Sequence, residues 1–312
     1  MYRIGIDLGG TNTAAGLVDA KGCIVDRESV KTNLPTTPER IVGDIIALCR
    51  KLMERNGLQN KDVCSVGVGV PCTANKRSGC MEDADHLGFA SGQLVQPLQD
   101  ALGLPVYIEN DANAAAWGEY QAGQYEADSF VLVTLGTGVG GGIILGGKLI
   151  TGVNNAAGEL GHMTIHMDGE PCGCGKRGCF ESYGSASALI RHAREATGEQ
   201  ITEAKEVFDR AAAGEQVFIR LLDTYTTHLA VGLANLINIF GPAYICIGGG
   251  VSQAGDALLQ VGLQGMGAQV NDVVQPHITG QLKFQHDAVG LDPFHQVLAL
   301  SAAEAGAVKA MA

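Results

Sequence analysis

Short apolar runs separated by glycine-rich turns recur along the chain and predict a fold built on β-sheets. The run at residues 2–7 is followed by the turn LGGTNT and by a second apolar run, AAGLVD. The run at residues 130–135 is followed by glycines at 136–142 and by a further apolar stretch. Apolar runs bounded by turn residues are typical of strands. We therefore expect strand, turn and strand at residues 4–18 and again at 131–145, as in a duplicated fold whose two turns hold phosphates.

Other apolar positions recur at helical spacing. Between residues 38 and 56, Ile41, Ile45 and Leu52 mark one apolar face, and Pro38 suits a first helical turn. The same reasoning predicts helices at 94–102, 112–120, 184–196, 203–212, 215–239 and 296–310. Further strands are expected at 63–70, 105–108 and 244–247. The connection that follows Pro71 and runs through residues 83–89 is polar and irregular, which is typical of a connection that faces a substrate.

Residues 136–148 partly match two nucleotide-binding sequence motifs, and we reject both. Gly136, Gly138 and Gly141 have the dinucleotide spacing, but that fingerprint requires a helix next, and GIILGGKLI predicts a strand and a turn. Residues 142–148 approach a P-loop, yet Leu149 replaces the Ser or Thr that binds magnesium.

Composition and charge describe a globular protein that acts on a small molecule. The 312 residues are 46% hydrophobic and 17% charged, which suits about two domains. We place these domains at residues 1–118 with 296–312, and at 119–295. No apolar run reaches the roughly 18 residues of a membrane span and no signal-peptide pattern is present, so a cytoplasmic protein is expected. The net charge of -12 disfavours nucleic acid and membrane surfaces as partners.

The segment at residues 159–181 contains the most specific motif. Cys172, Cys174 and Cys179 are closely spaced, and His162 precedes them. Three thiolates and one imidazole form the closed tetrahedral set of structural zinc sites. Intervening glycines allow turns tight enough to aim the thiolates at one point. We predict a zinc site in the second domain, either a loop staple or a device that also orients polar groups. The remaining cysteines are expected to be reduced.

Polar residues surround the first glycine turn. Gly9 and Gly10 would let a phosphate approach the backbone, and Thr11 and Asn12 would add donors. Asp7 would face the ligand directly or through Mg²⁺. A polar hairpin turn explains the motif equally well.

Two further groups lie where predicted strands end. Asn110 and Asp111 stand between a strand and a helix, and helix capping alone explains their types as well as a catalytic role does. Gly248, Gly249 and Gly250 would let a flat group approach the backbone, and an ordinary loop is the alternative.

Together these motifs resemble the ROK family of sugar kinases and repressors, especially its bacterial glucokinase branch. The matching motifs extend over nearly the whole chain: residues 7–11, 109–111, 135–138, 159–162, 172–175 with Cys179 and Glu181, and 248–250. The resemblance implies an α/β, two-domain actin-like or hexokinase-like (ribonuclease H-like) fold, with the active site in the cleft between the domains.

The resemblance also implies a role for each motif in transferring a phosphoryl group from ATP to a hexose. Asp111 would be the general base that takes the proton of the attacking sugar hydroxyl. The sugar would be bound by Asn110, Glu159, His162, Glu181 and His86. The phosphates would be held by Gly9, Gly10, Thr11, Asn12, Gly136, Thr137 and Gly138. Adenosine would lie near Gly248, Gly249 and Gly250. Asp7 would place Mg²⁺. Zinc would fix one nitrogen of His162 while the other binds the sugar.

Two positions depart from the family pattern and concern the identity of the sugar. Cys72 stands where the family's Gly-x-Pro-Gly motif ends in glycine, and His86 stands where the glucokinase branch usually has asparagine. An imidazole cannot offer both an oxygen acceptor and an NH₂ donor. Glucose is the first expectation, and allose, fructose or an N-acetylhexosamine are the alternatives. His86 as a simple loop residue is an equal possibility.

Other functional classes stay open. Repressors of this family have an additional N-terminal helix-turn-helix domain, whereas the first predicted strand here begins at residue 2, and the negative charge also disfavours DNA. A catalytically silent sugar sensor has no need of a base at Asp111, although a helix cap could preserve that residue type. The resemblance further suggests a homodimer or homotetramer.

Overall fold

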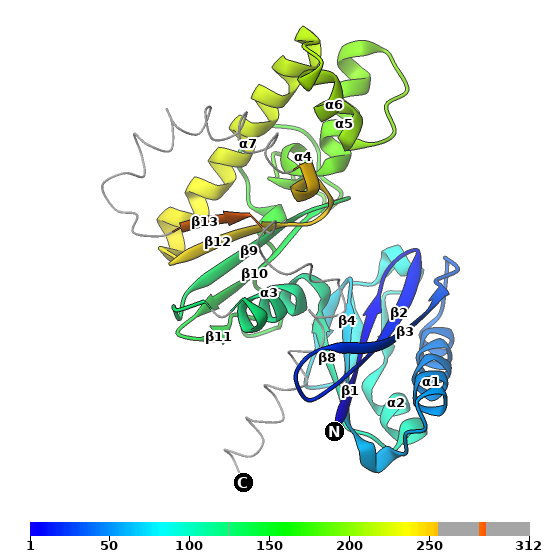
Figure 1. The fold of residues 1–312 in the computed structure, drawn as a ribbon. Coiled ribbons are helices and arrows are strands. Elements are labelled where there is room, and N and C mark those ends of the chain that lie inside the picture. Colours follow the sequence, from blue (N-terminus) through cyan, green and yellow to red (C-terminus); the bar gives the residue numbers. More distant parts are fainter. Residues whose placement is uncertain (124, 255–280, 285–312) are drawn as a thin grey trace. The chain divides into compact units, whose positions relative to one another are not determined.

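The computed structural model describes residues 1–123, 125–254 and 281–284 of the 312-residue chain. These residues form two compact α/β units, each with its own main sheet (Figure 1). Unit 1 comprises Met1–Tyr125 and Leu149–Ala157, and unit 2 comprises Glu126–Lys148 and the described residues from Gly158 onward. The predicted helix at 296–310 and the predicted domain segment 296–312 lie outside the described residues. The predicted boundary at residues 118 and 119 stays a prediction.

The main sheet of unit 1 has five strands in the order β3-β2-β1-β4-β8. Its strands are β1 (Tyr2–Leu8), β2 (Asn12–Val18), β3 (Ile24–Lys31), β4 (Val63–Val70) and β8 (Val106–Asn110). The first three form antiparallel pairs, whereas β4 and β8 run parallel to β1. The parallel register aligns Asp7 with Gly69 and Gly69 with Glu109. The carboxyl ends of these three strands therefore lie at one edge of the sheet, where open α/β sheets bind ligands.

Three α-helices accompany this sheet: α1 (Pro38–Arg55), α2 (Val95–Leu102) and α3 (Asp111–Ala122). The helix predicted at residues 38–56 is confirmed, since Oγ1 of Thr37 accepts a hydrogen bond from the N–H of Arg40 and Pro38 occupies the first turn. Its apolar face buries Ile45 and Leu52 completely. In unit 1, α1 packs on β2 and β3 while α2 packs on β8 (Figure 1).

A small three-stranded sheet stands where an irregular loop was predicted. It consists of β5 (Thr73–Asn75), β6 (Cys80–Glu82) and β7 (Ser91–Gln93), with the short helix η2 (Asp85–Leu87) between β6 and β7. The loop prediction was wrong for β5 and β6, and β7 was not predicted, because each strand has three residues, too few to show a period. Strand β3 was also missed, since it has no fully buried residue.

The main sheet of unit 2 repeats the strand order of unit 1. It contains β11 (Lys148–Leu149), β10 (Val139–Leu145), β9 (Phe130–Leu135), β12 (Tyr244–Gly248) and β13 (Gln281–Phe284), in that order. As in unit 1, an antiparallel hairpin, β9 and β10, adjoins parallel strands. The predicted repetition of strand, glycine turn and strand is thus confirmed in both sheets.

The helices of unit 2 are α4 (Glu181–Gly184), α5 (Ala186–Thr197), α6 (Ala204–Ala212) and α7 (Gln216–Phe240), and the short helix η3 spans Leu160–His162. Ser185 caps α5 through a hydrogen bond from the N–H of Ala188. Phe180 is fully buried between α4 and α7, where a Cβ on Gly232 would lie 2.5 Å from its ring. Among the described helices, none is both long enough and apolar enough to cross a bilayer.

Candidate functional site

The first glycine turn, between β1 and β2, keeps its backbone accessible. The N–H of Gly9 donates to the carbonyl of Asn12 at 3.0 Å, and a Cβ on Gly9 would lie 2.9 Å from that oxygen. Gly10, Thr11 and Asn12 are exposed. Asp7 is half-buried beside this turn, and burial raises the pKa of its carboxyl. A cation bound there would favour the ionised form that burial disfavours.

Asn110 and Asp111 stand where β8 ends and α3 begins, and the structure separates their local roles. Oδ1 of Asn110 accepts from the N–H of Asn113 at 3.1 Å, which is an ordinary helix cap. Its amide nitrogen donates to the carbonyl of Cys72 at 3.4 Å. The Asp111 side chain is exposed, and its Oδ1 accepts from the N–H of Ala112 at 2.7 Å. Capping thus explains Asn110, whereas Asp111 accepts a hydrogen bond within the first turn and keeps its side chain exposed.

The two residues that depart from the family pattern differ in exposure. Cys72 is buried, and burial, followed by the charges of Asp111 and Asp83, raises the pKa of its thiol to about 12. It therefore stays a neutral thiol at neutral pH. His86 lies in η2 with its side chain exposed. Both residues belong to unit 1, as do Asn110 and Asp111.

Two glycine turns of unit 2 lie side by side at the carboxyl ends of β9 and β12. The N–H of Gly136 donates to the carbonyl of Gly138 at 2.9 Å, and Thr137 between them is exposed. Gly248 is the last residue of β12 and pairs with Thr134 of β9. Gly249 has φ +86°, and a Cβ there would lie 2.5 Å from the carbonyl oxygen of Leu135. Only glycine fits this position without strain.

Gly250, the third glycine of that turn, is exposed and begins the short helix η4 (Gly250–Ala254). The sheet pairing therefore brings the second and third predicted glycine turns together within one unit.

Glu181, at the start of α4, connects the turn after β9 to the metal-ligand segment. Its Oε2 accepts from the N–H of Val139 at 3.1 Å, and a Cβ on Gly138 would collide with that same oxygen. Its Oε1 lies 3.9 Å from Sγ of Cys172. Glu159, whose carbonyl accepts from the N–H of His162 at 3.1 Å, is exposed at the start of η3.

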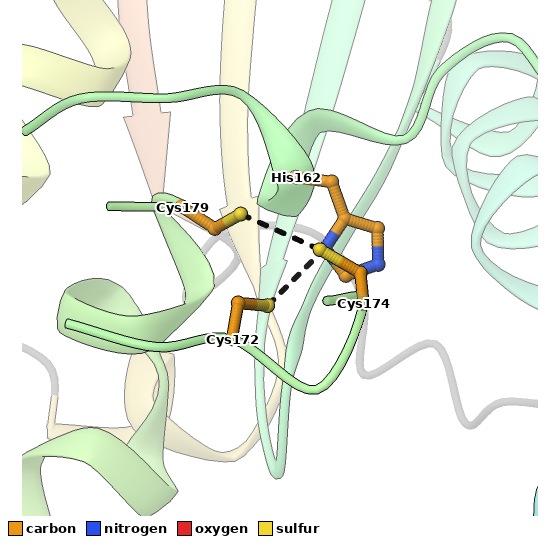
Figure 2. A group of neighbouring side chains, drawn as sticks. All are labelled: His162, Cys172, Cys174 and Cys179. Atoms are coloured by element: carbon orange, nitrogen blue, oxygen red, sulfur yellow. Dashed lines mark hydrogen bonds between the residues drawn. The ribbon is translucent and has the colours of Figure 1, made fainter. Parts of the chain in front are cut away.

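The predicted metal ligands converge on one point (Figure 2). The ligand atoms of His162, Cys172, Cys174 and Cys179 all lie within 4.8 Å of one another. Nδ1 of His162 is 3.7 Å from Sγ of Cys172, and the thiols of Cys174 and Cys179 are 3.6 Å apart. Ligands about 2.3 Å from a tetrahedral zinc ion are separated by about 3.8 Å, so this set fits such an ion.

The loop around these ligands has little regular structure. Isolated bridges join Thr164 to Cys179 and Pro171 to Arg177. Gly178 has φ +73°, and a Cβ there would collide with the carbonyl of His166. Burial, together with hydrogen bonds to the other two thiols, raises the pKa of Cys179 to about 12. Metal binding would displace this proton, because the thiolate is the form of cysteine that binds a metal.

Sequence reasoning missed two charged groups behind these sites. Glu109, which is 1% exposed, forms an ion pair with Lys76 at 2.5 Å. In unit 2, the carboxylate of Glu170 binds both Arg191 and His192 next to the metal loop. Neither group of interacting charges has a local sequence signal, because its members come from different parts of the chain.

Comparison with known proteins identifies the family. The family model described as ROK family matches residues 3–285. The chain belongs to the ROK family. It is 36% identical over 274 residues to a glucokinase of Halalkalibacterium halodurans, covering 83% of each chain. It is also 34% identical over 258 residues to an N-acetylmannosamine kinase of Escherichia coli, covering 81% of this chain and 84% of that one.

A solved ROK structure confirms the predicted fold. The ROK glucokinase of Streptomyces griseus, in complex with glucose and AMPPNP, superposes with a TM-score of 0.79 and 33% identity. The match covers 97% of this chain and 99% of that one. The predicted two-domain, hexokinase-like α/β fold of the ROK family is thus correct. This chain and the S. griseus glucokinase share the fold over nearly their whole length.

Proposed function

We propose that this ROK protein transfers a phosphoryl group from ATP to a hexose, with D-glucose as its first substrate. The observation that supports this most is the exposed carboxylate of Asp111 at the ligand-binding edge of the sheet, with the cap of α3 already supplied by Asn110. A carboxylate in this place can accept the proton of a sugar hydroxyl as it attacks phosphorus. The S. griseus relative, which binds glucose and an ATP analogue, supports the choice of substrates.

The glycine turns and Asp7 hold the nucleotide in this proposal. The turns after β1 and β9 offer backbone N–H groups to the phosphates, and Gly248, Gly249 and Gly250 lie near the adenosine. Asp7 helps to place Mg²⁺, whose charge compensates the burial that raises the pKa of this carboxyl.

The proposed sugar ligands are Asn110, Glu159, His162 and Glu181. We propose that His162, Cys172, Cys174 and Cys179 bind zinc. Nδ1 is the ring nitrogen that faces Cys172, so Nε2 of His162 is left to hydrogen-bond a sugar hydroxyl. A zinc ion held by these four residues would fix the tautomer and the orientation of the ring. Glu181 is held in place by the N–H of Val139 as well as by its position next to the loop.

A kinase for a different sugar is the second candidate, and His86 supports it. This exposed imidazole stands where the glucokinase branch usually has asparagine, and one relative is an N-acetylmannosamine kinase. A sugar-responsive regulator without kinase activity is the third candidate. We also propose a homodimer or homotetramer, which light scattering of the purified protein tests directly.

A coupled ADP-release assay across a panel of hexoses tests the function. The parent protein is expected to turn over at least one hexose, and Asp111→Ala is expected to lose that turnover. A 6-deoxyhexose matched to the best substrate is the control, because it lacks the acceptor hydroxyl. Absence of turnover with every sugar contradicts a kinase. Undiminished activity of Asp111→Ala contradicts the assigned base.

A further inference from the structure

Glu109, the residue before Asn110, is a buried carboxylate at the carboxyl end of β8. It is 1% exposed, although it lies only two residues before the exposed Asp111. A buried charge is costly unless a countercharge and hydrogen bonds compensate it. The groups that compensate Glu109 therefore show what this residue holds in place.

Its two oxygens bind different parts of unit 1. Oε1 accepts from the N–H of Asn110 at 2.9 Å and from the side-chain amide of Asn113 at 3.4 Å. Oε2 lies 2.5 Å from the ammonium of Lys76, which comes from the turn between β5 and β6. One carboxylate thus connects the small sheet to the residues on either side of Asp111.

The contacts of Glu109 are not required for the N-terminal cap of α3. Oδ1 of Asn110 already caps the helix by accepting from the N–H of Asn113. The contacts of Glu109 instead fix the N–H of residue 110 and the amide of residue 113, which bracket Asp111. A displacement of about 1 Å in a catalytic group can reduce a rate about 100-fold, so the orientation of this short segment matters.

We propose that Glu109 and Lys76 are positioning residues that hold Asp111 in the orientation for proton transfer. This inference rests on the proposed function of Asp111. Lys76 supplies a countercharge to the buried side chain of Glu109, and Glu109 transmits that restraint to the start of α3. The small sheet, absent from the sequence-based prediction, thereby takes part in building the site.

Substitution of Lys76 tests the proposal, with a neighbouring residue as its control. Lys76→Met leaves the Glu109 carboxylate buried without its cation, and kcat is expected to fall about 10- to 100-fold while KM for ATP stays within about threefold. Arg77→Met removes a positive charge from an exposed side chain in the same turn and is expected to leave kcat unchanged. Lys76→Arg retains the charge and is expected to keep most of the activity.

The double variant Lys76→Met/Glu109→Gln separates positioning from simple loss of stability. A glutamine oxygen can still accept from the N–H of Asn110, and no buried charge remains. We expect kcat to recover to within about fivefold of the parent value. Unchanged kcat in Lys76→Met overturns the proposal. The proposal is also overturned if kcat falls only in proportion to the loss of Tm and does not recover in the double variant.

Hydrogen exchange provides a readout that does not depend on turnover. Faster exchange is expected in Lys76→Met for the peptide that contains residues 106–122, and parent-like exchange is expected in the double variant. If the parent phosphorylates no hexose, the proposed function fails while this measurement still tests the restraint. Unchanged exchange in Lys76→Met contradicts the restraint itself.

Discussion

The start of α3 in unit 1 and the metal-ligand loop of unit 2 hold their polar side chains by different means. Asn110 ends a strand that pairs in register with β4 and Asp111 follows it, with a helix cap at Asn110 and the buried Glu109 paired with Lys76 beside them. The loop at residues 159–181 contains η3, isolated bridges and the four converging ligands, and Glu170 within it binds Arg191 and His192. The comparison indicates that backbone pairing orients the proposed base, whereas the proposed metal would orient His162. Substitutions at the start of α3 should therefore lower kcat, and substitutions in the metal-ligand loop should raise KM for the sugar.

The largest expected effect is that of Asp111→Asn. Asparagine keeps the size of the side chain and is tolerated in a first helical turn, but it cannot accept the proton. We expect kcat to fall by about 10²- to 10⁴-fold, the usual contribution of a general base. Initial rates at saturating sugar and ATP measure this. Asp100→Asn removes an exposed carboxylate from another helix of unit 1 and is the control. A similar loss of kcat in that variant would contradict the role assigned to Asp111.

Loss of the metal is expected to be the second largest effect. Cys174→Ser, or chelation of the parent, should raise KM for the sugar by about 10- to 100-fold while kcat changes much less. Elemental analysis should show zinc in the parent and its loss in the variant. Cys23→Ser alters another exposed cysteine outside the cluster and is the matched control. A zinc-free protein that binds sugar with full affinity would falsify the orienting role.

A smaller change is expected from His86→Asn. The substitution restores the amide that the glucokinase branch usually has, so kcat/KM for glucose should rise about tenfold relative to that for N-acetylmannosamine. Asp85→Asn alters the preceding exposed residue of η2 and should not change the preference. Identical sugar preferences in His86→Asn and the parent would show that His86 is a loop residue that does not select the sugar.

The smallest expected effect concerns the stability of unit 1 near Asp7. Burial raises the pKa of Asp7, so the folded state binds this proton more tightly than the unfolded state does. The stability from this group is therefore greatest at low pH and is lost as the pH rises through the folded pKa. Without Mg²⁺ and ATP, the Tm of Asp7→Asn relative to the parent should increase from acid to neutral pH, by about 2–4 °C for each kcal/mol.

Calorimetry at several pH values, with exposed Asp100→Asn as the control for charge loss, measures this difference. A Tm difference that shrinks as the pH rises would show that burial does not disfavour the Asp7 carboxylate.

The sequence predicted the parts of the fold that are marked by long periodic elements or by glycine. The hairpins around the turns after β1 and β9, and the helices α1 and α7, have enough residues to show their period. The metal ligands were predictable because their chemistry restricts residue types and because three of them are close in sequence. Of the four, only His162 is separated from the rest, and it too belongs to a recognisable motif.

The features that could not be predicted from the sequence are those whose interacting partners are distant in the chain. Strands β5, β6 and β7 are too short for a pattern, and their hydrogen bonds to one another stabilise them. The pairing of Lys76 with Glu109 depends on that small sheet, so it could not be predicted before the sheet was known. Glu181 was assigned to the sugar from family resemblance, whereas its bond to the N–H of Val139 appears only in the structure.

The most direct test of the proposed division of labour is calorimetric binding of glucose to Asp111→Asn and to Cys174→Ser. The account predicts that Asp111→Asn binds glucose with a Kd within about threefold of the parent while its turnover is lost, because the base acts in the transition state. It predicts that Cys174→Ser binds glucose at least about tenfold more weakly. Weak binding by Asp111→Asn together with parent-like binding by Cys174→Ser would contradict the account.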